Sequence, residues 1–142
     1  MGYTHYWKGR VPTLSPELRD DVKTVFEFCE FSGISIAGGL GEGKPELTGA
    51  RLWFNGKDDE SYETFGVEFG LSTEFDFCKT QYRPYDLAVV AVLELLTLHG
   101  EGEFSWSSDG DVYGENDEQT HGPDHADGIA LAQRIIKERM GV

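Results

Sequence analysis

The sequence predicts an α+β domain in which three helices pack on a mainly antiparallel sheet of about four to five strands. Short segments alternate between apolar and polar residues, and three longer segments repeat apolar residues at helical spacing. The strands are joined by hairpin-like links, which gives the element order β-α-β-β-β-α-β-α. With 142 residues, 39% of them hydrophobic, the chain is expected to form a single domain over residues 1–142.

The opening segment Met-Gly-Tyr-Thr-His-Tyr-Trp predicts the first strand. Tyr3, His5 and Trp7 alternate with Thr4 and Tyr6 at the period of a strand. Chain ends usually fray, but burying an aromatic ring stabilises the fold by roughly 1.5–3 kcal/mol. We therefore expect an ordered strand in which Tyr6 or Trp7 is mostly buried.

Residues at the ends and an apolar face identify each of the three expected helices. Ser15 and Pro16 begin the first helix, whose apolar stripe consists of Leu18, Val22, Val25, Phe26 and Cys29, and Gly33 ends it. The second opens within residues 82–86, is apolar nearly all round over 87–96 and ends at Gly100, so it should be central. The face of the C-terminal helix consists of Ile129, Ala132, Ile136 and Met140.

The remaining strands are expected at residues 34–37, 51–54, 65–69 and 103–107. The pair Asn55-Gly56 is typical of a turn, so the second and third of these should form a hairpin with a long tip. Residues 111–124 are polar, acidic and glycine-bearing, which predicts a long loop.

Charge and composition exclude several classes of protein. Twenty-six acidic against 12 basic residues give a net charge of −14, which repels nucleic acid and anionic membranes and attracts basic protein surfaces. No apolar run approaches the ~20 residues of a membrane span, and we expect no signal peptide because the N-terminus lacks a basic region followed by an apolar one. Cys29 and Cys78 are expected to be reduced, buried thiols in the cytoplasm.

Two motifs suggest chemistry but lack required parts. Gly38 to Lys44 matches the start of a phosphate-binding P-loop, but Pro45 follows where Ser or Thr should bind Mg²⁺, which favours a flexible glycine loop. For the group His121, Asp124, His125 and Asp127 to bind a metal, His5 or His99 would have to complete the ligand set from a distance. Pro123 also prevents a helical pair of the two histidines, and Asp124 is better explained as a helix cap. We expect no metal, no cofactor and no assigned catalytic residue; Cys78 would be a nucleophile only beside a histidine.

The best small-ligand site lies before the second helix. Lys79 and Arg83 flank Tyr82 where helix N–H groups favour an anion, although Arg83 could instead pair with Asp86. Adding the opening strand gives a proposed ligand-binding set of six residues: Tyr3, His5, Trp7, Lys79, Tyr82 and Arg83.

Several phrases resemble those of a family of small bacteriophage and prophage proteins with no established function. They are Met1–Trp7, Phe54–Gly56, Glu63–Phe65, Phe77–Thr80, Arg83–Asp86 and Ser107–Gly110. The resemblance spans nearly the whole length and implies a setting in which small accessory proteins neutralise a host factor or a defence signal. It brings no activity, cofactor or catalytic residue with it.

Three functions follow as hypotheses. The first is a non-enzymatic, phage-type accessory protein in the host cytoplasm. It would act in counter-defence as an inhibitor that captures a host protein with a basic surface or a nucleotide-like defence signal. The second is a small hydrolytic enzyme that uses His5 with the acidic and histidine residues of 109–127. The third is a virion assembly protein. The sequence leaves the oligomeric state open, with a homodimer as one option.

Overall fold

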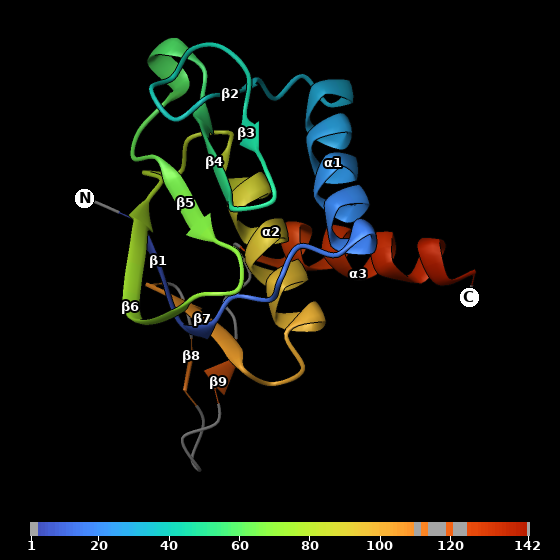
Figure 1. Cartoon of the computed structure of the whole chain (residues 1–142). Helices are drawn as coiled ribbons and strands as arrows, with labels where there is room; N and C mark the ends of the chain where they lie inside the picture. The colour runs from blue at the N-terminus through green and yellow to red at the C-terminus, as the bar shows by residue number, and fades with distance from the viewer. Residues whose placement is uncertain (1–2, 110–111, 114–118, 121–124, 142) are drawn as a thin grey trace.

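The computed structural model describes residues 3–109, 112–113, 119–120 and 125–141. It confirms the α+β class, with three α-helices and antiparallel sheets among these residues (Figure 1). In chain order the elements are β1 (Thr4–Arg10), α1 (Pro16–Phe31), β2 (Ile36–Ala37), β3 (Glu46–Leu47), β4 (Arg51–Gly56), the 3-10 helix η1 (Asp58–Glu60), β5 (Phe65–Glu68), β6 (Ser72–Lys79), α2 (Asp86–His99), β7 (Phe104–Ser108), β8 (Val112–Tyr113), β9 (Gln119–Thr120) and α3 (Ala126–Met140).

The opening segment forms the middle strand of a three-stranded sheet ordered β6-β1-β7. The expected burial is confirmed, because Trp7 is only 3% exposed and its ring packs 5.1 Å from that of Phe65. The ladder to β6 shifts register between Trp7 and Gly9, and Gly9 has a φ of 101°. A Cβ on Gly9 would lie 2.0 Å from the carbonyl oxygen of Glu103, so this bulge requires glycine.

A second group of strands is built on β4, which pairs antiparallel with β2, β3 and β5. Asn55 and Gly56 were expected in a turn, but they lie within β4 and pair with β2. The Asn55 amide group donates to the carbonyl oxygens of Gly39 and Tyr62, which fixes the loop between β4 and β5. The predicted hairpin of β4 and β5 is confirmed.

Helix α2 is central, as its apolar composition predicts, and it contacts α1, α3 and β7. The predicted cap of α1 is present, because the Ser15 hydroxyl accepts a hydrogen bond from the Leu18 amide. The buried stripe of α3 differs from the expected one: it consists of Gly128, Leu131, Ala132 and Ile135, while Met140 is 67% exposed.

Strand β6 was not expected from the sequence. Its aromatic residues Phe75 and Phe77 are 62% and 46% exposed, whereas the sulfur-bearing Cys78 is buried. The alternation of aromatic residues in β6 would place Phe75 and Phe77 in the core, but the structure buries the opposite face of the strand.

The polar segment 111–124 lies largely outside the described residues. Its two described residue pairs, β8 and β9, form an antiparallel ladder.

Among the described residues, none of the helices combines the length and the apolar character needed to cross a membrane.

Candidate functional site

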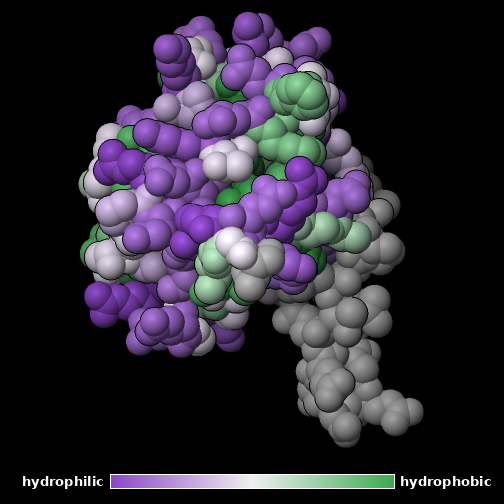
Figure 2. Space-filling view, turned by 90° about the vertical axis from the view of Figure 1, so that its right-hand side faces the viewer, coloured by the Kyte–Doolittle hydropathy of each residue, from purple (hydrophilic) through white to green (hydrophobic). Residues whose placement is uncertain are grey.

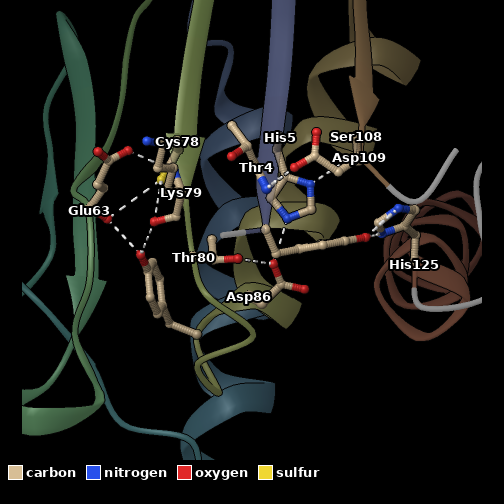
Figure 3. Close-up of polar contacts among 12 residues, drawn as sticks. Thr4, His5, Glu63, Cys78, Lys79, Thr80, Asp86, Ser108, Asp109 and His125 are labelled. Carbon is tan, nitrogen blue, oxygen red and sulfur yellow. Dashed lines mark hydrogen bonds and ion pairs between the residues drawn. The ribbon is translucent and has the colours of Figure 1, made fainter. Parts of the chain in front are cut away.

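The site is built around His5, whose side chain is fully buried in the middle of the three-stranded sheet. Its Nδ1 atom lies 2.5 Å from the Ser108 hydroxyl oxygen, and its Nε2 atom lies 2.5 Å from Oδ1 of Asp86. Figure 3 shows the imidazole between these two side chains. The three residues thus form an unbroken hydrogen-bonded chain from carboxylate to imidazole to hydroxyl.

Three elements distant in sequence bring this chain together. In the β1–β7 ladder His5 lies directly opposite Ser108, the last residue of β7. Asp86 is the first residue of α2, where the positive end of the helix dipole favours a carboxylate. The Thr80 hydroxyl also donates to Oδ1 of Asp86 at 2.5 Å, so the carboxylate is held from two sides.

The hydrogen-bonding capacities assign the protons within the chain. An ionised carboxylate can only accept, so in the neutral tautomer of the imidazole that matches this chain, Nε2 carries the ring proton and donates it to Asp86. Nδ1 is then left with a lone pair and accepts the hydrogen bond from the Ser108 hydroxyl. This is the arrangement in which a histidine can remove a proton from a serine nucleophile.

Aromatic rings surround His5. The rings of Tyr3 and Trp106 lie 5.1 and 6.2 Å from it, and that of His125 lies 5.6 Å away. The Tyr3 hydroxyl oxygen lies 2.8 Å from Nδ1 and 2.6 Å from Nε2 of His125. Burial lowers the pKa of His125 below its ordinary value, so this second histidine favours its neutral form.

The outer edge of the cluster is a turn with an unusual backbone. Gln81 and Tyr82 have φ values of 53° and 59°, in the left-handed region that bulky residues rarely adopt. The Tyr82 ring stacks on Tyr3 with a centroid separation of 4.1 Å, although Tyr82 is 60% exposed. Strained backbone of this kind often marks functional sites, where the surrounding structure holds it in place.

The structure brings together only part of the predicted ligand-binding set. Tyr3, His5 and Tyr82 belong to the cluster, but Trp7 is buried in the core. Lys79 pairs with Thr4 while its neighbour Cys78 pairs with His5. Because successive residues of a strand point to opposite faces, Lys79 lies on the other face of the sheet from His5.

Arg83 is exposed in the turn before α2, and the structure shows no ion pair between its guanidinium and Asp86 among the described residues. The Asp86 carboxylate bonds to His5 and Thr80 instead. The carboxylate of Asp109, which follows β7, has no recorded contact with His5 among the described residues. It accepts hydrogen bonds from the Thr4 amide and the Tyr6 hydroxyl.

Both cysteines are free and buried, as expected. Burial raises the pKa of Cys78 to about 12, and its sulfur lies 3.5 Å from the carbonyl oxygen of Glu63. The Tyr85 hydroxyl donates to the same carbonyl at 2.7 Å. A thiol this far from ionisation is a poor nucleophile, so Cys78 is a packing residue.

No group of three or more metal-ligating side chains occurs among the described residues. Of the residues weighed for a metal, His121 and Asp124 lie outside them. His99 lies elsewhere, where it and Arg139 bond to the buried carboxylate of Asp21 and join the three helices.

Sequence analysis missed Thr80, Asp86 and Ser108 as members of the His5 cluster. Asp86 was considered only as a partner for Arg83, and Ser108 only as part of the phrase Ser107–Gly110. Each is a common residue type without a local motif, so only the strand register and the position of α2 reveal their convergence.

A scan against protein-family models found no match to this chain, and neither did searches of curated proteins and of solved structures. The functional argument therefore rests on the geometry of the site.

Proposed function

We propose that this protein is a small hydrolase that cleaves an acyl ester or a related acyl compound. Ser108 is its nucleophile, His5 its general base and Asp86 the residue that orients the histidine. The observation that carries the proposal is the hydrogen-bonded chain of Asp86, His5 and Ser108, with both links at 2.5 Å. A nucleophile bonded to a base that is itself oriented by a third group is the structural signature of covalent catalysis.

The reaction follows from the proton positions. The Ser108 oxygen attacks the acyl carbonyl carbon while its proton passes to Nδ1 of His5, and Asp86 stabilises the imidazolium through the Nε2 proton. Nδ1 then returns the proton to the leaving alkoxide, which departs as an alcohol. In the second half, water attacks the acyl-serine, again losing a proton to His5, and the acid is released with Ser108 restored.

The surroundings of the chain support this assignment. The aromatic rings around His5 limit the access of water to the base, which strengthens its electrostatic interactions. The phrases that carry the resemblance to phage proteins also supply the cluster. Residues 1–7 contribute Tyr3 and His5, residues 77–80 and 83–86 contribute Thr80 and Asp86, and residues 107–110 contribute Ser108.

This proposal is a specific form of the enzymatic hypothesis, with one change. The carboxylate that orients His5 comes from Asp86 rather than from residues 109–127. The six-residue ligand site is less well supported, because Trp7 and Lys79 do not lie with the other residues.

Hydrolysis of p-nitrophenyl acetate tests the proposal. Ser108→Ala should lower the second-order rate constant by at least about 10²-fold, because no acyl-serine forms without the hydroxyl and His5 can then act only as a general base for water. Ser107→Ala is the matched control, because Ser107 precedes the nucleophile but faces the other side of the sheet. Equal rates in the wild type and a folded Ser108→Ala variant would contradict the proposal.

A further inference from the structure

A hollow with a volume of about 560 Å³ lies between α1, the segment leading into β2 and the loop before β3. Its floor is apolar and packs on the core through Phe26, Ile34, Ile36 and Leu47. Its size is within the range of pockets that bind small organic molecules. The side of the molecule that carries α1 is otherwise mainly hydrophilic, with small hydrophobic patches (Figure 2).

Three lysines surround this floor. Lys23 comes from α1, Lys44 from the glycine loop and Lys57 from the residue after β4, and all three are exposed. They are half of the six lysines in a chain of net charge −14, and Glu30 is the one carboxylate among the lining residues. The structure records no ion pair for any of the three among the described residues.

The glycine loop that carries Lys44 has a defined backbone. The Gly38 amide bonds to the carbonyl oxygens of Glu42 and Gly43, and the Gly41 amide bonds back to Gly38. The Asn55 and Thr64 side chains both donate to the carbonyl oxygen of Gly39. The loop is therefore tied to β4 and β5, and it fixes the backbone position of Lys44 at the hollow.

We propose that this hollow binds a small organic anion, with its apolar body on the floor and its charged group among the three ammonium groups. The anionic group is a phosphate or a carboxylate, carried by a nucleotide-like or an acyl body. At physiological ionic strength the Debye length is about 8 Å, so acidic residues far from the hollow are largely screened, whereas Glu30 in the lining and Asp58 beside Lys57 reduce its positive charge. This function is independent of the hydrolytic one, since the hollow shares no residue with the His5 cluster.

The fluorescent probe 8-anilinonaphthalene-1-sulfonate, an aromatic anion, tests the site by titration. The wild type should bind one probe molecule, and Lys44→Gln and Lys57→Gln should each raise its Kd by about 5–10-fold, as expected for loss of one charge-assisted contact. Lys137→Gln, an exposed lysine of α3, is the matched control and should leave the Kd unchanged. Thermal melting checks that all variants are folded.

Competition identifies the ligand class. Displacement of the probe by AMP but not by dodecanoate indicates a nucleotide-like ligand, and the opposite result indicates an acyl carboxylate; either outcome supports the site. Three results would overturn it: Lys44 and Lys57 variants that bind as the Lys137 variant does, no displacement by either competitor, or displacement by inorganic phosphate as effective as that by AMP.

Discussion

At the residue scale, the His5 cluster contains two histidines with different environments. His5 contacts the Asp86 carboxylate and the Ser108 hydroxyl, whereas His125 contacts the Tyr3 hydroxyl. A carboxylate can hold the imidazolium that forms when a base takes up a proton. In the proposed mechanism, the contact with Asp86 therefore suits His5 to the role of general base.

The lowered pKa of His125 predicts how stability depends on pH. The unfolded chain binds a proton at the ordinary histidine pKa of about 6.5, but the folded protein binds it only at lower pH. The stabilisation is therefore complete above that value and is lost as pH falls below it, with a slope of up to about 1.4 kcal/mol per pH unit.

Urea unfolding between pH 7.5 and 5.5 measures this dependence. In His125→Gln the amide group can still bond to Tyr3 but cannot titrate, so the slope below pH 6.5 should become smaller. An unchanged slope in this variant would show that other groups account for the acid sensitivity.

At the scale of elements, the bulge at Gly9 shifts the register of β1 against β6, while the ladder of β1 with β7 continues unbroken through Gly9. Gly9→Ala combines a strained φ of 101° with a contact of 2.0 Å to the Glu103 carbonyl oxygen. We expect this variant to lose about 2–5 kcal/mol of unfolding free energy, from the backbone strain and the overpacking together.

The matched control is Gly49→Ala, because a Cβ at Gly49 meets nothing within 4 Å and its φ is not in the left-handed region. Its unfolding free energy should stay within about 0.5 kcal/mol of the wild type. Chemical denaturation of both variants checks the prediction, and equal stability of the two would show that β1 and β7 can separate at the bulge without cost.

The elements also explain which parts of the fold could be predicted from the sequence. The capped helix α1 and the apolar helix α2 carry strong local signals at Ser15 and over residues 87–96. Strand β6 does not, because Phe75 and Phe77 point to solvent. His5 was recognised as a candidate from its unusual surroundings, but Ser108 and Asp86 lie 103 and 81 residues away, and only strand register and helix packing place them beside it.

At the scale of the whole molecule, the two proposed sites lie on different secondary-structure elements. The His5 cluster lies on β1, β7 and the start of α2, and the lysine-lined hollow lies on α1 and the loops around β2 and β3. The net charge of −14 surrounds a locally positive hollow, so anions should bind there by short-range contacts rather than by long-range attraction.

Covalent labelling of Ser108 tests the central claim most directly. The folded wild type should react with a fluorophosphonate at one serine, identified as Ser108 by peptide mass spectrometry, because His5 activates that hydroxyl only when β1, β7 and α2 are assembled. Labelling should disappear in Ser108→Ala and in urea, and it should persist in Ser107→Ala. A folded wild type that stays unlabelled, or that is labelled equally after unfolding, would contradict the assignment of Ser108 as a nucleophile.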